Sequence, residues 1–353
     1  MRGQPIPIRP RRNAAANPSV LSTEREELAQ QLANRLVGQT HAIAEIVPYV
    51  QMYRAGLGPE GRPAGVFLLL GPTGTGKTRT VEALADVLHG SEKNLLRVDC
   101  GEFQMEHEVA KLIGAPPGYL GHRETPPMLT QQKLGALTSE GSHLSLLLFD
   151  EIEKAAPSMT RLLLSVLDKA VLRLGDNTSV NFERTLIFLT SNLGSSAMRK
   201  QLLPDFGFAA GVPEGHGSGT LHKLSSIGLG AVKRKFAPEF VNRIDAVITY
   251  QPLDERALEA ILDQQIAALE RHIAHRLKDN AFTLELDTSA RRFLLAKGTS
   301  REYGARELKR VILRKLTQPL AEMLETGLIP PDSVVQVGHV GDNEQLALSV
   351  IES

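Results

Sequence analysis

The sequence predicts an α/β protein whose core is a parallel β-sheet. Short apolar runs of buried-strand type alternate with segments of helical periodicity, which is typical of a parallel sheet covered by helices. One strand–helix junction, Gly71–Thr78, also fits the pattern of a phosphate-binding loop. Five segments are the candidate strands of this sheet: Val66–Leu70, Leu95–Asp99, Leu144–Phe149, Thr185–Leu189 and Ala246–Tyr250.

The loop Gly71-Pro-Thr-Gly-Thr-Gly-Lys77-Thr78 matches G-x-x-x-x-G-K-[ST] at every fixed position. It follows the apolar run 65–70 and precedes a helical apolar pattern over 81–88. Its glycines let backbone N–H groups face a polyphosphate at the helix N-terminus. We expect Lys77 to reach the β and γ phosphate oxygens and Thr78 to hold Mg²⁺. The predicted nucleotide-binding residues of the loop are Pro72, Thr73, Gly74, Thr75, Gly76, Lys77 and Thr78.

Two further candidate strands end in polar residues. Asp150 and Glu151 follow the run 144–149, at the strand end where open α/β sheets place their ligands. We expect Asp150 to reach Mg²⁺ and Glu151 to polarise the water that attacks the γ-phosphate. Asn192 ends the next candidate strand and can orient the same water if that strand lies beside the other two. Two adjacent acidic residues at a strand end are, on their own, as often ordinary surface residues as part of a site. The prediction therefore depends on the phosphate loop.

The chain divides into three predicted parts. Residues 1–22 are basic and proline-containing and are expected to form a disordered tail. A large α/β domain covers 23–250, in which the Gly- and Pro-rich stretch 201–230 is expected to be an exposed loop. Pro252 and the helix-capping Asp254 mark the boundary to a small α+β domain over 251–353. Its expected elements are a helix over 258–273, a strand Phe282–Leu286, a helix Ala305–Leu324, and strands Val334–Val337 and Leu346–Val350.

Composition narrows the functional classes. The chain has 40 basic and 40 acidic residues, so its net charge predicts no bulk attraction to nucleic acid or anionic lipid. No apolar stretch approaches the ~20 residues of a membrane span, so no membrane partner is expected. The single cysteine, Cys100, excludes an internal disulfide framework and suits a reducing compartment. We therefore expect a cytoplasmic enzyme.

Several motifs occur in a fixed order along the chain. They are Arg35-Leu-Val-Gly-Gln39, the phosphate loop, Leu112-Ile-Gly-Ala-Pro-Pro-Gly-Tyr-Leu-Gly121, Phe149-Asp-Glu-Ile-Glu-Lys154, Thr190-Ser-Asn-Leu-Gly-Ser195, Phe236-Ala-Pro-Glu-Phe-Val-Asn-Arg-Ile-Asp245 and Tyr303-Gly-Ala-Arg-Glu-Leu-Lys-Arg310. This order closely resembles the second ATPase domain of the Clp/ClpB unfoldases and disaggregases of the AAA+ superfamily, over roughly Thr23 to Ser353. The resemblance implies an AAA+ P-loop fold with a five-stranded parallel sheet, a small C-terminal lid domain, and ATP with Mg²⁺ as ligands.

The resemblance also implies roles at matched positions. Arg243 resembles the arginine finger, which acts in the neighbouring subunit's site and therefore implies a ring, usually a hexamer. Arg306 resembles the sensor-two arginine that touches the γ-phosphate from the small domain. Val37 and Gly38 match the segment that packs on adenine. An isolated arginine is more often a solvated or ion-paired side chain, and only the motif context overturns that interpretation.

Tyr119 and Leu120 are the residues that bear on the substrate. Gly118 and Gly121 flank them and favour an exposed loop tip, although a buried tyrosine is the usual alternative. In the family this loop lines the pore of the ring and grips an unfolded polypeptide. The resemblance therefore implies an ATP-driven unfoldase that threads a polypeptide client.

The sequence departs from the family in three respects. No part of this sequence matches the substrate domain that full-length relatives carry, His122-Arg-Glu-Thr-Pro-Pro127 replaces the usual acidic continuation, and Gly175–Val180 lacks a common Gly-Arg pair. The peptidase-docking tripeptide of some relatives has two candidates here. Phe206-Gly-Phe208 has an atypical first residue, and Ile227-Gly-Leu229 has the right residues but is expected on the helix leading to Lys233, so a peptidase partner is not favoured. Two alternatives stay open: a ring that assembles or dismantles one partner complex, its client delivered by an adaptor, and a nucleic-acid motor.

Overall fold

The computed structural model describes residues 18–114, 126–202, 218–299, 304–341 and 344–351. Its main sheet has five parallel strands in the order β2-β3-β6-β1-β7. The strands are β1 (Gly65–Leu70), β2 (Leu96–Asp99), β3 (Ser145–Asp150), β6 (Thr185–Ser191) and β7 (Ala246–Thr249). All five coincide with the predicted strands to within two residues at each end, and the five-stranded parallel sheet is confirmed.

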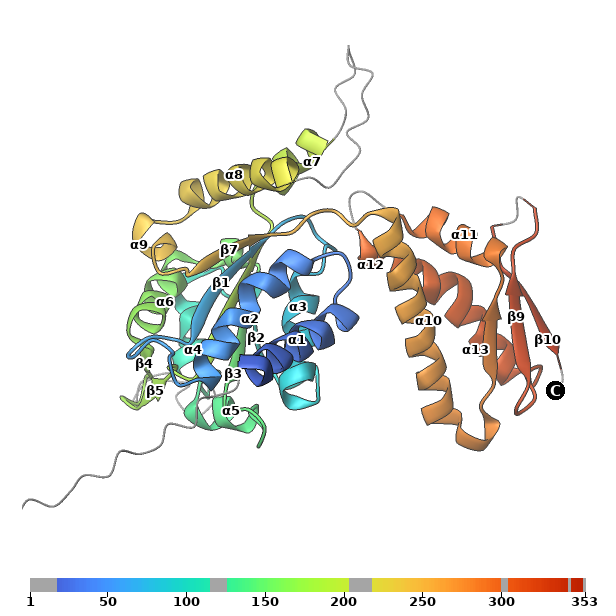
Figure 1. The fold of residues 1–353 in the computed structure, drawn as a ribbon, viewed down its shortest axis with the longest axis horizontal. Coiled ribbons are helices and arrows are strands. Elements are labelled where there is room, and N and C mark those ends of the chain that lie inside the picture. The colour runs from blue at the N-terminus through green and yellow to red at the C-terminus, as the bar shows by residue number, and fades with distance from the viewer. Residues whose placement is uncertain (1–17, 115–125, 203–217, 300–303, 342–343, 352–353) are drawn as a thin grey trace, which may run out of the picture.

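Helices cover both faces of this sheet (Figure 1). On β1, Phe67 and Leu69 face the helices α1 (Pro18–Arg35), α2 (Thr40–Arg54) and α3 (Lys77–His89). Leu68 and Leu70 face the opposite way, toward α6 (Pro157–Lys169), α8 (Ser218–Lys235) and α9 (Pro238–Val241). Every residue of β1, β3 and β6 is buried, as expected for central strands of a three-layer fold. Among the described helices, none has the length and apolar character to cross a bilayer.

Three details of the large α/β part differ from expectation. Helix α1 begins at Pro18, so the last residues of the predicted tail are helical. The predicted loop over 201–230 is wrong at residues 201–202, which are helical, and from residue 218 onward, where α8 starts. The expected placement of Ile227-Gly-Leu229 on the helix leading to Lys233 is confirmed, since α8 contains these residues. An antiparallel hairpin of β4 (Val171–Arg173) and β5 (Ser179–Asn181) was not predicted, since three-residue strands leave no periodic signal. The remaining short helices are α4 (Ala110–Ile113), α5 (Gln131–Ala136) and α7 (Ser195–Leu202).

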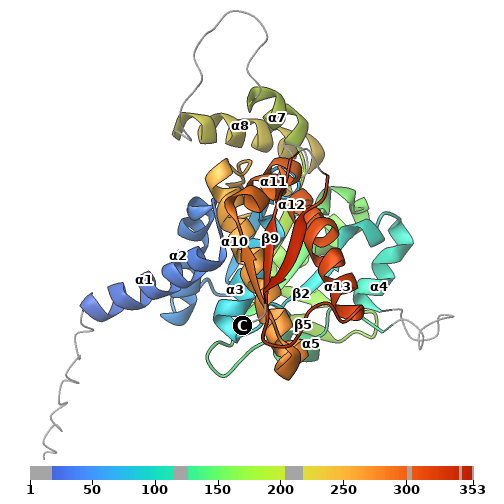
Figure 2. The ribbon, with the colours of Figure 1, turned by 90° about the vertical axis from the view of Figure 1, so that its right-hand side faces the viewer.

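The C-terminal part has its own hydrophobic cluster, to which none of the described residues before Leu253 belongs. Its long helix α10 (Glu255–Leu277) starts at the predicted cap, where the Asp254 carboxylate accepts a bond from Ala257 N at 2.7 Å. The predicted helix over 305–324 is α12 (Ala305–Ile312) and α13 (Gln318–Glu325), joined by a π-helical turn, Leu313–Thr317. Strands β8 (Thr283–Leu286), β9 (Val334–Gly338) and β10 (Ala347–Ile351) form a second sheet, with α11 (Thr288–Gly298) beside it. Figure 2 shows this part end-on.

Candidate nucleotide-binding site

The loop between β1 and α3 adopts a conformation that requires glycine. Gly71 has φ +150°, and a Cβ there would lie 2.7 Å from the carbonyl oxygen of Tyr250 on the neighbouring chain segment. Gly76, the residue before α3, has φ +103°. L-residues rarely adopt such angles, so the glycine spacing of the motif follows from backbone geometry. The loop leads directly into the N-terminus of α3, and the backbone N–H groups at a helix N-terminus favour the binding of an anion.

Lys77 lies at the base of this loop and is largely buried. Its ammonium group donates to the carbonyl oxygens of Gly71 (2.6 Å) and Pro72 (2.9 Å), and to Asn192 Oδ1 (2.9 Å). Burial lowers the pKa of Lys77 to about 8, although the nearby carboxylates Glu153, Asp150 and Glu151 act in the opposite direction. Because folding has already removed most of the hydration of this ammonium group, it loses little more on binding a phosphate, and the low local dielectric strengthens their attraction.

The carboxyl ends of β3 and β6 bring the predicted polar residues together. The two strands are direct neighbours, so Asn192 lies next to the acids that follow β3. Glu151 has φ +57°, an unusual value for a non-glycine residue, and its backbone N–H donates to Thr190 Oγ1 at 2.9 Å. Its carboxylate accepts a bond from Asn192 Nδ2 at 3.0 Å and forms an ion pair with Lys154. A continuous chain of contacts thus runs from Lys77 through Asn192 to Glu151.

Both oxygens of Asp150 have partners. Thr190 donates to Oδ1, and Arg97, from β2, donates to Oδ2. Neither partner was predicted from the sequence. The available signal for Thr190 was its position two residues before Asn192, and for Arg97 its position two residues before Asp99 at the end of a strand. These contacts hold the Asp150 side chain at the edge of the sheet.

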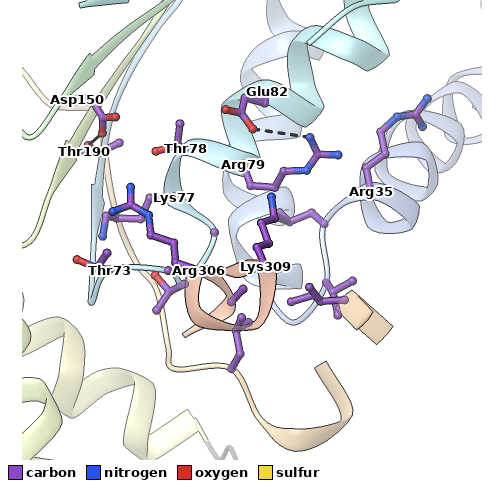
Figure 3. A pocket seen from close by; sticks show the side chains of 18 of the residues that line it. Arg35, Thr73, Lys77, Thr78, Arg79, Glu82, Asp150, Thr190, Arg306 and Lys309 are labelled. Carbon is purple, nitrogen blue, oxygen red and sulfur yellow. Dashed lines mark hydrogen bonds and ion pairs between the residues drawn. The ribbon is translucent and has the colours of Figure 1, made fainter. Parts of the chain in front are cut away.

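A cavity lies between the two parts of the chain and contains most of the predicted site residues (Figure 3). Arg306 and Lys309 project into it from α12. The predicted residues that line it are Val37, Thr73, Gly74, Thr75, Gly76, Lys77, Thr78, Asp150, Glu151, Asn192 and Arg306. Lining residues that the sequence did not single out include Arg35, Ile261, Gln264, Gln265 and Lys309.

Three predicted site residues do not line the cavity, and two others fall outside the residues that the structure describes. Gly38 and Pro72 are not among the lining residues, although the Pro72 carbonyl contacts Lys77. Arg243 also lies outside the cavity of its own chain and pairs with Asp168. Tyr119 and Leu120 fall outside the described residues, and so does the first peptidase-docking candidate, Phe206–Phe208.

Two contacts join the C-terminal part to the phosphate loop. Gly304, just before α12, has φ +51°, and a Cβ there would lie 2.8 Å from the carbonyl oxygen of Gly74. Ala305 N donates to that same oxygen at 3.2 Å, which brings the start of α12 onto the loop and Arg306 into the cavity. The second contact is the buried Gln39, whose Nε2 donates to the carbonyl oxygens of Thr75 (3.1 Å) and Gln251 (2.9 Å).

Thr78 and Asp150 are the residues that would hold Mg²⁺. Both line the cavity and both offer oxygen, the donor that this cation prefers. Over the described residues there is no group of three or more His, Cys, Asp or Glu side chains that could form a cation site by itself. Mg²⁺ usually takes one or two protein ligands and completes its shell with phosphate oxygens and water, so the residues present fit an ion that arrives with a nucleotide.

Two family models match separate segments of the chain. A family model described as "AAA domain (Cdc48 subfamily)" matches residues 62–247, and one described as "C-terminal, D2-small domain, of ClpB protein" matches 253–337. The chaperone protein ClpB of Rhodopseudomonas palustris is 39% identical over 327 residues, which are 91% of this chain and 34% of that protein. ClpB of Meiothermus ruber is 38% identical over 324 residues, or 90% of this chain and 35% of that protein.

A solved structure agrees with these matches. The closed-state cryo-EM reconstruction of Hsp104 with ATPγS and FITC-casein is similar with a TM-score of 0.75 and 27% identity, over 96% of this chain and 53% of that one. The chain spans about a third of the length of the curated relatives it matches. Since the first family model covers more than half of the chain, this protein belongs to the AAA domain family and resembles the second ATPase region of ClpB.

Proposed function

We propose that this chain binds and hydrolyses ATP with Mg²⁺ and uses the energy, as a subunit of a ring, to unfold or remodel polypeptides. The observation that carries the proposal is the chain of contacts from the phosphate-loop Lys77 through Asn192 to Glu151, in a cavity that Arg306 also lines. It supports a site where three groups meet: the Lys77 ammonium, which pairs with phosphate; the Asn192 amide, which orients water; and the Glu151 carboxylate, which acts as the base. The proposed division into a large domain, 23–250, and a small domain, 251–353, assigns the two walls of the cavity to different domains.

In the proposed reaction, backbone N–H groups of residues 73–78 and the Lys77 ammonium bind the phosphates. The Glu151 carboxylate accepts a proton from the attacking water, and the Asn192 amide orients that water. Arg306 neutralises charge on the γ-phosphate from the C-terminal part. Thr78 and Asp150 would hold Mg²⁺, which would neutralise charge on the phosphates when bound. The resemblance assigns the contact with adenine to Val37, which lines the cavity, and to the adjacent Gly38, which does not.

The proposed assembly is a homo-hexameric ring in which Arg243 completes the neighbouring site. Its position outside its own cavity and its 43% exposed side chain support action between subunits. A cation that reaches a phosphoryl group only across an interface makes hydrolysis depend on assembly.

The proposed client is an unfolded polypeptide gripped by Tyr119 and Leu120. Support comes from the resemblance to ClpB, described as a chaperone, and from the Hsp104 structure, which was determined with a casein. An adaptor that delivers the client is compatible with this proposal, and the cytoplasm is its proposed location. A peptidase partner is not favoured: the second docking candidate, Ile227-Gly-Leu229, lies within α8, where Gly228 packs against Met198 and Leu70.

The roles of Lys77 and Glu151 are tested by comparing two variants. Lys77→Ala removes the phosphate charge partner and is expected to weaken nucleotide binding. Glu151→Gln is expected to bind ATP as the wild type does and to abolish turnover. Fluorescent-nucleotide titration and phosphate release measure the two quantities separately. Equal loss of binding in both variants would contradict the assigned roles.

The polypeptide client is tested with the same Glu151→Gln variant, which should retain clients in the ATP state. Unfolded casein captured by this variant with ATP, and released with ADP, supports the remodelling proposal. Capture of one defined complex without casein binding would favour the alternative of a ring dedicated to one partner complex. Capture of nucleic acid alone would favour the motor alternative.

A further inference from the structure

The side chain of Arg243 is supported from two directions. Its backbone is fixed just after α9, where Arg243 N donates to Phe240 O at 3.2 Å. Phe240 is 2% exposed and stacks on Phe236 with ring centroids 5.2 Å apart, so the backbone of this segment is anchored in the core. The guanidinium group itself pairs with the Asp168 carboxylate at 3.2 Å.

Asp168 is held by a rigid element. It lies in the last turn of α6, whose apolar face, including Leu163, Val166 and Leu167, is buried against the main sheet. The helix ends at Lys169 and is followed by Ala170, a buried residue in the left-handed conformation. Because the C-terminal end of a helix carries partial negative charge, the carboxylate and the helix end both attract the guanidinium group of Arg243.

We propose that Asp168 is a positioning residue for Arg243, holding its side chain in the orientation from which it enters the neighbouring subunit's site. This inference rests on the proposed action of Arg243 between subunits. An unpaired arginine samples many rotamers, and ordering it on assembly costs conformational entropy. A partner on a rigid helix reduces that cost before the subunits meet, which is the effect of preorganisation.

The first test compares turnover in Asp168→Ala, Asp168→Glu, Arg243→Ala and the double variant Arg243→Ala/Asp168→Ala. Asp168→Ala is expected to lower kcat about two- to fivefold, the range that an exposed ion pair can give, with unchanged KM and nucleotide Kd. Asp168→Glu restores most of the rate. The double variant has the same kcat as Arg243→Ala, because Asp168 affects turnover only through Arg243. Glu344→Ala, which removes an exposed carboxylate paired with Lys297 at 3.1 Å, is the matched control and leaves kcat unchanged.

The second test separates action on a neighbour from a structural role in the same subunit. Asp168→Ala subunits are mixed with Glu151→Gln subunits, which cannot hydrolyse ATP but carry an intact Arg243 and Asp168. The rate per Asp168→Ala subunit should approach that of wild-type subunits mixed in the same proportion. A constant two- to fivefold deficit at all mixing ratios would show that Asp168 acts on its own site and would overturn the inference.

The possible failures are distinguishable. If Arg243→Ala retains full ATPase activity, the proposed role of Arg243 fails and the inference about Asp168 fails with it. If Arg243→Ala is impaired but Asp168→Ala is equal to or faster than the wild type, only the positioning role is overturned. Sedimentation of each variant with ATP shows whether ring assembly has changed, and a loss of assembly confined to Asp168→Ala would also overturn it.

Discussion

Replacing Gly304 with alanine should disconnect the C-terminal part from the phosphate loop. A Cβ at this position would lie 2.8 Å from the carbonyl oxygen of Gly74, 3.1 Å from its carbonyl carbon and 3.4 Å from its Cα. All three atoms belong to the backbone, so no side chain can rotate to relieve the contact. Ordinary non-bonded contacts begin near 3.5 Å, and the start of α12 must therefore retreat from the loop by roughly 0.5 Å or more.

The magnitude follows from what this retreat breaks. The hydrogen bond from Ala305 N to Gly74 O, already 3.2 Å long, is lost, at about 1 kcal/mol. If α12 stays docked instead, alanine must adopt φ +51°, which costs about 1–3 kcal/mol. Over the two routes, the arrangement that holds Arg306 in the cavity is disfavoured by about 1–3 kcal/mol, and we take the middle of this range, about 2 kcal/mol. Nucleotide binding then has to restore that arrangement, so ATP affinity should fall about thirtyfold.

The assay is titration with a fluorescent ATP analogue, combined with thermal unfolding of the nucleotide-free protein. Gly327→Ala is the matched control, because Gly327 has a similar φ of +73° but nothing within 4 Å of the added Cβ. That variant should lose stability through backbone strain and keep its ATP affinity. An unchanged ATP affinity in Gly304→Ala, or an equal loss in both variants, would refute the argument that this contact positions α12.

Three further predictions concern single residues. Because the pKa of Lys77 is about 8 in the free protein and only the charged form pairs with phosphate, ATP affinity should fall about tenfold between pH 7 and pH 9, measured as Kd by titration; a flat profile would contradict a titrating Lys77. Tyr250→Phe removes the 2.7 Å hydrogen bond from the buried hydroxyl to Thr80 Oγ1 and should lower the free energy of unfolding by about 1 kcal/mol, measured by urea denaturation. An unchanged free energy of unfolding would mean that this hydrogen bond contributes nothing to stability. Tyr119→Ala should keep substantial basal ATPase and lose client unfolding, whereas Tyr119→Phe should keep both, since the aromatic ring makes the proposed grip; normal unfolding by the alanine variant would defeat the threading proposal.

The sequence by itself determined those elements, and that part of the chemistry, which follow from local sequence patterns. The five strands of the main sheet were predictable because buried parallel strands are short apolar runs, and the phosphate loop because its glycines are required by backbone angles that other residues rarely adopt. The start of α10 was predictable from Asp254, whose capping bond spans only three residues. Each of these features depends on interactions between near neighbours in the chain.

Only the tertiary structure decided which distant residues complete the site. Gln39 is hydrogen-bonded to Gln251, which is 212 residues away in the chain, and Arg97 to Asp150, which is 53 residues away. Gly304 lies so close to the backbone of Gly74 that it leaves no room for a Cβ. The pairing of Arg243 with Asp168 likewise depends on how α9 packs on α6. Such contacts are set by the packing of whole elements against one another, and a glutamine, an arginine or a single glycine carries no periodic signal that would indicate its partner.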